Sequence, residues 1–250
     1  MNFLSASSTM SDTRENTGGF DRDRERMHRQ MLSSVSHDLK TPLASIIGSL
    51  EVFERMKDKL PEDKQLALVQ VALQEAYRLD NFITNILDMA KLDNGLVKAK
   101  NESADISEML QNSILRLNHR LRGTQVNVKG AGPLRSMTDA TLLGRVVCLI
   151  LDNAVKYGGA TATIDIEFGK SEDGKGFVSI RDRGRGIPAE QVEAIFSKYT
   201  RFAKEDQQNA GTGLGLAIAR SIMALLGGQI TGANHPEGGA VFTLKFPVSN

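Results

Sequence analysis

Two long amphipathic patterns occupy the first part of the chain. Apolar residues recur at steps of three and four from Met31 to Phe53, and again from Leu66 to Ala90. This spacing predicts two helices with one apolar face each, separated at Pro61. We expect a helical hairpin that buries these faces against a second copy, which gives a dimeric four-helix bundle.

Shorter patterns follow residue 95. The strand-like runs span residues 125–128, 162–168, 176–181 and 240–246, and the helix-like runs span residues 106–121, 140–157 and 214–226. Hairpin-like strand pairs combined with helices predict an α+β layer, with one mixed sheet and helices on one face. Residues 1–20 are rich in Ser, Thr and Asn and predict a disordered leader or linker. We therefore expect three parts: a leader over residues 1–20, a helical hairpin over 21–95 and an α/β domain over 96–250.

The composition excludes several classes of protein. The 250 residues are 40% hydrophobic and 24% charged, as in ordinary globular proteins. A balance of 31 basic and 30 acidic residues argues against nucleic acid as a partner, and the single cysteine, Cys148, excludes a disulfide scaffold. No apolar run approaches the ~20 residues of a membrane span, and no signal-peptide pattern begins the chain. We expect a cytoplasmic location without direct membrane contact in this chain, compatible with a membrane-anchored parent protein.

His37 lies in the first helical pattern, on the face opposite the apolar residues. The ordinary interpretation of a lone histidine there is a solvated side chain. Asp38 beside it can hydrogen-bond one ring nitrogen and leave the other as a nucleophile. Thr41 follows one turn later on the same side, and Pro42 removes a helical hydrogen bond just beyond. These neighbours favour a histidine that accepts and surrenders a phosphoryl group.

Glycines are sparse in the hairpin and dense in the second half, where they form two motifs. The first motif is Asp182-Arg183-Gly184-Arg185-Gly186, and the second is Gly211-Thr212-Gly213-Leu214-Gly215-Leu216. Glycine lets backbone N–H groups approach phosphate, and a helix N-terminus favours anions. Neither motif is a Walker or dinucleotide fingerprint, and each alone is also typical of an ordinary loop. The segment between them predicts a mobile lid, whose basic residues, Lys198 and Arg201 among them, either contact phosphate or are solvated.

The end of the helical run 140–157 carries a third candidate group. The carboxamide of Asn153 suits Mg²⁺, the ammonium of Lys156 suits phosphate, and the ring of Tyr157 can lie beside a base. The carboxylate of Asp182 can accept a hydrogen bond from an adenine amino group. The alternative is a polar helix end with a packed tyrosine.

Together and in this order, these segments resemble the sensor histidine kinases of two-component systems, and among these the potassium-responsive branch. The resemblance covers residues 27–248. Residues 36–43 are similar to the phosphoacceptor box of that family, 152–157 to the asparagine box, 182–186 to the first glycine box, 195–199 to the phenylalanine box and 211–216 to the second glycine box. The resemblance implies a dimerisation and phosphotransfer hairpin followed by a Bergerat-type ATP-binding α/β sandwich.

The resemblance also implies roles for residues. His37 would be the phosphoacceptor through Nε2, Asp38 the acid/base that orients Nδ1, and Thr41 a residue that helps to position water for dephosphorylation of the regulator. Asn153 would hold Mg²⁺. The implied nucleotide-binding residues are Asn153, Lys156, Tyr157, Asp182, Gly184, Gly186, Lys198, Arg201, Gly211, Thr212, Gly213, Leu214 and Gly215.

The function implied is autophosphorylation of His37 from Mg-ATP, followed by transfer to an aspartate on the receiver domain of a response regulator, with phosphatase activity toward that regulator. The partners implied are a second copy of the chain and that regulator. Because the histidine and the nucleotide lie on different domains, the connection at residues 92–96 must permit the domains to rotate.

Leu149 departs from the family pattern. The family usually carries a polar residue four positions before the metal-binding asparagine, and ATPases of the same fold carry a glutamate there that activates water. Leucine cannot act as a base, which argues against a stand-alone ATPase. Two alternatives stay open: a degenerate kinase that acts mainly as a phosphatase or phosphorelay module and, less favoured, the stand-alone ATPase.

Overall fold

The computed structural model describes residues 35, 36, 38–118, 120, 121, 123–130, 132–158, 163–198 and 213–248. The chain divides into two compact units, residues 1–82 and 83–250. The division falls inside the second long helix, so that the last three turns of this helix belong to the second unit. The boundary between functional domains that was predicted at residue 95 differs from this division into compact units, and it stays a prediction.

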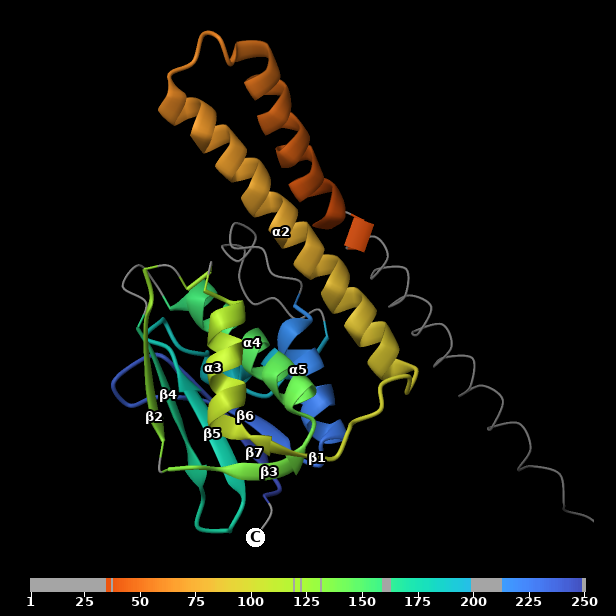
Figure 1. Cartoon of the computed structure of the whole chain (residues 1–250), viewed down its shortest axis with the longest axis vertical. Helices are drawn as coiled ribbons and strands as arrows, with labels where there is room; N and C mark the ends of the chain where they lie inside the picture. The colour runs from red at the N-terminus through yellow and green to blue at the C-terminus, as the bar shows by residue number, and fades with distance from the viewer. Residues whose placement is uncertain are drawn as a thin grey trace, which may run out of the picture. The chain divides into compact units, whose positions relative to one another are not determined.

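The first unit contains the predicted helical hairpin, which is confirmed (Figure 1). Its first helix covers residues 38–56, and helix α2 (Glu62–Asp93) begins with two acidic residues in its first turn, where negative charge is favoured by the helix dipole. Gln65 closes the connection, because its Nε2 donates to the carbonyl oxygens of Lys57 and Leu60 at 2.7 and 2.9 Å. Large apolar side chains stay exposed on both helices of the single chain: Leu43, Ile47, Leu50, Leu66, Val69 and Leu73.

The second unit is built on the predicted mixed sheet, which is also confirmed. Five strands lie in the order β2-β4-β5-β7-β6, and only the β2–β4 pair is parallel. The strands are β2 (Gln125–Gly130), β4 (Thr163–Lys170), β5 (Gly176–Arg181), β6 (Gln229–Asn234) and β7 (Ala240–Phe246). Buried and less buried residues alternate along β5 and β7, as expected for strands with one covered face.

A two-stranded antiparallel ribbon, β1 (Glu102–Asp105) with β3 (Arg135–Thr138), lies outside this sheet. The sequence patterns predicted neither of these strands and did not predict β6. The reason is physical: β1 and β3 have four residues each and are largely polar, and β6 contains a glycine among polar residues. Such segments are strands because of their pairing, which a local pattern cannot show.

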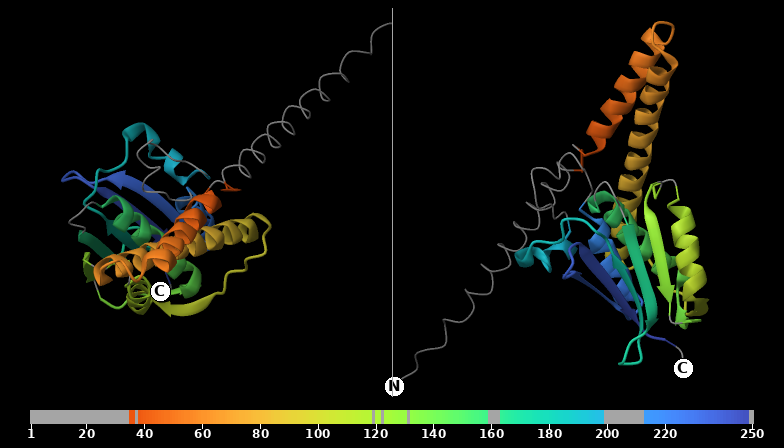
Figure 2. Two further views of the ribbon diagram at one scale, coloured as in Figure 1. Left: turned by 90° about the horizontal axis from the view of Figure 1, so that it is seen from above. Right: turned by 90° about the vertical axis from the view of Figure 1, so that its left-hand side faces the viewer.

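Three helices cover one face of the sheet (Figure 2). They are α3 (Ile106–Arg116), α4 (Ala140–Tyr157) and α5 (Gly215–Leu225), and α4 packs against both others. Asp105 and Asp139 cap α3 and α4, since each side chain accepts hydrogen bonds from two first-turn amides. Helix α3 ends five residues before the predicted end at residue 121. Among the described residues, no helix combines the length and apolarity needed to cross a membrane.

Candidate functional site

Helix α4 places the first group of candidate residues. Its buried face includes Val146, Ile150 and Ala154, which fix the rotation of the helix against the sheet. Asn153, Lys156 and Tyr157 therefore stay at the less buried side of its last two turns.

The first glycine motif lies directly against this end of α4. A Cβ atom built on Gly184 would come within 2.0 Å of the carbonyl oxygen of Tyr157, so that only glycine permits the approach. Gly186 has a φ of +76°, which also favours glycine. The structure thus brings together two of the motifs singled out in the sequence.

Asp182 directly follows β5 and is hydrogen-bonded to the first residue of β7, Ala240. Its side chain is buried, with a relative exposure of 4% for the residue. Its Oδ1 accepts hydrogen bonds from the backbone N–H groups of Gly184 (2.8 Å) and Ala240 (3.1 Å), and its own N–H donates to the carbonyl oxygen of Ala240 (3.0 Å). Its Oδ2 accepts no hydrogen bond from the described residues. One carboxylate oxygen is therefore used by the fold, and the second remains available to a donor on a ligand.

Gly239 supports Asp182 from the neighbouring turn. A Cβ atom at Gly239 would lie 1.9 Å from the carbonyl oxygen of Asp182, and the φ of Gly239 is +86°. The sequence reasoning missed this residue. The pair Gly238-Gly239, just before a strand, was the signal that could have indicated it.

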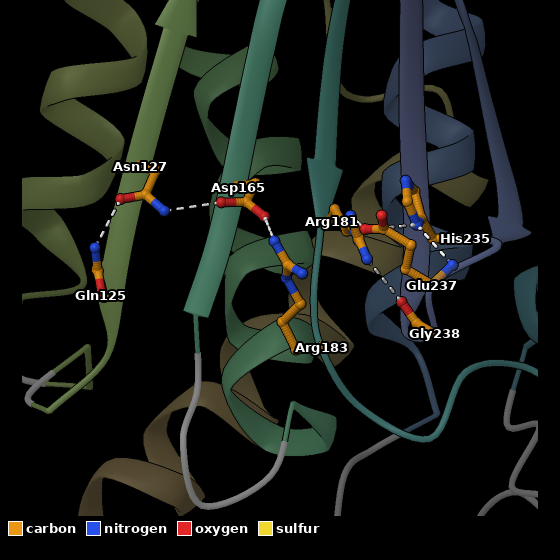
Figure 3. A network of polar contacts seen from close by, with 8 residues as sticks. All are labelled: Gln125, Asn127, Asp165, Arg181, Arg183, His235, Glu237 and Gly238. Atoms are coloured by element: carbon orange, nitrogen blue, oxygen red, sulfur yellow. Dashed lines mark hydrogen bonds and ion pairs between the residues drawn. The ribbon is translucent and has the colours of Figure 1, made fainter.

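A polar network fixes the first glycine motif to the sheet (Figure 3). The Nη2 of Arg183 donates to Asp165 Oδ2 at 2.6 Å, and Nδ2 of Asn127 donates to Asp165 Oδ1 at 2.8 Å. The hydrogen bond from Asn127 and the charge and hydrogen bond of Arg183 lower the pKa of the Asp165 carboxyl, although burial opposes them. On the other side, Arg181 donates to Glu237 and to the carbonyl oxygen of Gly238.

Two cations lie near the ring of Tyr157. The Nζ of Lys156 is 4.8 Å from the ring centroid, and the Cζ of Arg185 is 5.6 Å from it. Both distances are within the range of cation–π contacts. The end of α4 and the first glycine motif therefore present an aromatic face with positive charge beside it, which suits a flat, anionic ligand.

The second glycine motif is described from Gly213 onward. Gly213 has a φ of +63°, and the buried Leu214 precedes the start of α5 at Gly215. Among the described residues no side chain caps helix α5 at its start, and the first-turn amides of a helix suit an anion. A Cβ atom at Gly215 would lie 3.7 Å from Cδ2 of Leu149 on α4. The N-terminus of α5 thus lies beside α4, one turn before Asn153, and a third motif joins the same region.

Leu149 is a packing residue in this arrangement. It is buried and belongs to the core between α4 and α5. A carboxylate or carboxamide at this position would have to be desolvated beside the glycine backbone. The side chain supplies no hydrogen bond to a water molecule or a metal ion.

The residues before the second motif are anchored by aromatic and polar contacts. Phe196 is buried and meets Phe242 edge to face, with ring centroids 6.4 Å apart. The guanidinium of Arg220 lies 4.9 Å from the Phe196 centroid and pairs with Glu193 at 2.9 Å. Lys198 follows Phe196 by two residues. Its Nζ donates to both carboxylate oxygens of Asp93, at 2.7 Å each. Lys198, expected near phosphate, thus contacts a carboxylate here.

The remaining candidates are placed as follows. Asp38 is half-buried and Thr41 is exposed, both in the first helix of the hairpin. His37, Arg201, Gly211 and Thr212 lie outside the described residues, as does most of the segment predicted to be a lid.

No cluster of three or more His, Cys, Asp or Glu side chains that suits a metal ion occurs in the part of the chain that the structure describes. At the site, Asn153 offers one neutral oxygen ligand. This fits an Mg²⁺ ion that takes its other ligands from phosphate and water.

Comparison with known proteins gives two family matches. The model "His Kinase A (phospho-acceptor) domain" matches residues 27–95, and the model "Histidine kinase-, DNA gyrase B-, and HSP90-like ATPase" matches residues 138–250. The sensor protein KdpD of Escherichia coli (strain K12) is 34% identical over 229 residues, which are 90% of this chain and 25% of KdpD. The sensor protein VanS of Enterococcus faecium is 31% identical over 227 residues, which are 89% of this chain and 58% of VanS. The chain therefore spans only part of these relatives.

Among solved structures, the histidine kinase ThkA in complex with the response regulator protein TrrA is similar in fold. Its TM-score is 0.67 at 24% sequence identity, covering 98% of this chain and 68% of that chain. This likeness extends over both the hairpin and the α/β unit.

Proposed function

Because the chain belongs to the histidine kinases of two-component systems, with a phosphoacceptor domain followed by an ATP-binding domain, we propose that it phosphorylates its own His37 from Mg-ATP and passes the phosphoryl group to an aspartate of a response regulator. The observation that carries the proposal is the convergence of three motifs around the end of α4, with one oxygen of the buried Asp182 left available.

The nucleotide is assigned to this convergence by its chemistry. Oδ2 of Asp182 accepts a hydrogen bond from the adenine amino group, and the ring of Tyr157 lies along the base. Lys156 and the N-terminus of α5 attract the phosphates. Asn153 would hold Mg²⁺, and the ion would neutralise charge on the phosphates. Arg201, Gly211 and Thr212 belong to this assignment through the resemblance alone.

The chemical step is carried by the hairpin. Nε2 of His37 attacks the γ-phosphorus, the bond between that phosphorus and the bridging oxygen to the β-phosphate breaks, and ADP leaves. Asp38 accepts a hydrogen bond from Nδ1–H, which leaves Nε2 unprotonated for the attack and stabilises the charged ring that forms. The phosphoryl group then passes from Nε2 to a carboxylate oxygen of the regulator. Thr41 is assigned to positioning the water molecule that removes the phosphoryl group from the regulator.

Dimerisation is proposed through the hairpin. The apolar side chains exposed on both of its helices need a covering partner, and a second copy presents the same face. The partner regulator is proposed with the support of the similar kinase ThkA, which was solved in complex with the response regulator protein TrrA.

A second candidate function follows from Leu149. Since this buried side chain offers no polar atom beside Asn153, a chain with weak kinase activity that acts mainly as a phosphatase or phosphorelay module is the alternative. Phosphatase activity toward a phosphorylated receiver domain, without label from ATP in the same preparation, would favour it.

The test is incubation with γ-labelled ATP and Mg²⁺. We expect a label on the protein that is lost in acid and kept in base, as for a phosphohistidine, and that is absent from the His37→Gln variant. A folded dimer that binds ATP but acquires no such label would refute the autokinase. ATP turnover that persists in His37→Gln would instead indicate a stand-alone ATPase.

A further inference from the structure

The last three turns of α2 are fixed to the second unit by apolar packing. Met89 is buried in the core of that unit, and Ile86 and Leu92 pack against the same core. These residues lie one helical turn apart and therefore share a face.

Hydrogen bonds between α2 and α4 accompany this packing. Arg145 of α4 donates from Nε to Asp88 Oδ2 at 3.1 Å and from Nη2 to Asn85 Oδ1 at 2.8 Å. The end of α2 is thus held on α4, the helix that carries Asn153 at its other end.

The final contact joins Asp93, the last residue of α2, to Lys198. Nζ lies 2.7 Å from each carboxylate oxygen. Both side chains are near the surface, with exposures of 48% for Asp93 and 43% for Lys198. Directly after Asp93 the helix ends: Leu96 N donates to Lys91 O at 2.9 Å, and Gly95 has a φ of +63°, which is a common form of helix termination. The pair therefore lies beside the connection that must rotate for His37 to reach a nucleotide.

The resemblance to the kinase family implies a second use for Lys198, as a contact for nucleotide phosphate, and the proposed function includes this use. A carboxylate and a phosphate are alternative anionic partners for one ammonium group, and the charge of Asp93 also repels phosphate. We propose that Asp93 competes with nucleotide phosphate for Lys198, so that phosphate binding releases the last turn of α2 from the ATP-binding unit. This inference rests on the proposed function and assigns Asp93 a regulatory role at the same site.

The expected effect is small and measurable. Exposed ion pairs are worth up to about 1 kcal/mol, so that removal of Asp93 is expected to tighten binding of a phosphorylated nucleotide by about two- to fivefold. Adenosine has the base and no phosphate. Its binding is therefore expected to be independent of Asp93.

The chain offers a closely matched control. Asp173 has the same exposure as Asp93, 48%, and also pairs with a lysine, Lys245, at 3.8 Å. It lies in the turn between β4 and β5, at the end of β5 remote from Asp182. Asp173→Asn removes the same charge from the protein without affecting Lys198.

The experiment measures dissociation constants for ATP with Mg²⁺ and for adenosine by titration calorimetry on the full chain. We expect Asp93→Asn to tighten ATP about two- to fivefold, to leave adenosine unchanged, and to have no effect in a Lys198→Met background, where the competition is absent. Asp173→Asn should leave both constants unchanged. Equal affinity of Asp93→Asn and the unmodified chain for ATP would overturn the inference, as would an equal gain for adenosine or a gain that persists in Lys198→Met.

Hydrogen exchange supplies the second measurement. ATP should accelerate exchange of the backbone amides at residues 91–96 in the unmodified chain, and adenosine should not. Unchanged exchange on ATP binding would also overturn the inference. The proposed function fails separately, if the folded chain binds neither ATP nor adenosine.

Discussion

Asp182→Asn tests the adenine site without disturbing the fold. In the structure, Oδ1 accepts two backbone hydrogen bonds, at 2.8 and 3.1 Å, and Oδ2 accepts none from the described residues. The carboxamide oxygen of asparagine can keep both backbone bonds. Its NH₂ group then replaces Oδ2, which turns an acceptor for the adenine amino group into a donor facing a donor.

The magnitude follows from these bonds. A hydrogen bond to a charged group contributes about 1.5–3 kcal/mol, which corresponds to a loss of about 10- to 150-fold in ATP affinity. The loss of stability should be smaller, about 1 kcal/mol, because both backbone N–H groups keep a partner. In contrast, Asp182→Ala leaves two buried N–H groups unpaired and should destabilise the fold by about 2–6 kcal/mol.

The assay is nucleotide titration of Asp182→Asn alongside urea unfolding. Guanine carries a carbonyl oxygen where adenine carries the amino group, so the ratio of ATP affinity to GTP affinity should fall in the variant. A folded Asp182→Asn with unchanged affinity and unchanged preference for adenine would refute the assignment of Asp182.

Three further outcomes are expected. Gly184→Ala should lower the free energy of unfolding by about 1–3 kcal/mol, because the new Cβ would be 2.0 Å from a backbone oxygen. Gly48→Ala should not lower the free energy of unfolding, because no atom lies within 4 Å of the added Cβ. Equal urea midpoints for Gly184→Ala and Gly48→Ala would contradict the prediction. The folded-state pKa of Asp165 is lowered, so its contribution to stability is present above the unfolded pKa and lost as the pH falls through the folded value. Asp165→Asn should accordingly lower the urea midpoint at pH 7, and this difference should shrink as the pH falls below about 4 toward the lowered folded pKa. A difference in urea midpoint that does not depend on pH would count against this prediction. Burial raises the pKa of the Cys148 thiol; its modification by a disulfide reagent at pH 8 should be slow and should accelerate in urea, and a native rate equal to that of a free thiol would be the contrary result.

The elements that could be predicted from the sequence are those with a regular local pattern of apolar residues. The long helix α2 and the buried helix α4 follow from the spacing of apolar residues, and α4 spans the predicted residues 140–157. The short strands β1 and β3 have no such pattern, because their pairing with each other defines them. Dimerisation is a property of two chains, and the exposed apolar face of the hairpin in one chain only motivates it.

The same distinction applies to the site. Motifs indicated Asp182, Gly184 and Tyr157 separately, and the structure adds that Gly184 is required by contact with the end of α4. Gly239 was missed because its role, a close approach to the backbone of Asp182, depends on a neighbour 57 residues away in sequence.

Lys198 shows why the identity of a residue does not decide its role. From its place between two glycine motifs, the ammonium group of Lys198 was expected either to contact phosphate or to be solvated, and the resemblance implied the phosphate contact. The structure gives this group a carboxylate partner at the end of α2, a contact between residues 105 positions apart that no local pattern contains. The two uses compete, since both need the same ammonium group and the carboxylate repels a phosphate placed beside it. A residue for which two partners compete couples them: phosphate weakens the contact with Asp93 by the same free energy by which Asp93 weakens the binding of phosphate. If the nucleotide takes Lys198, it acts on the connection through which the phosphoacceptor helix must move.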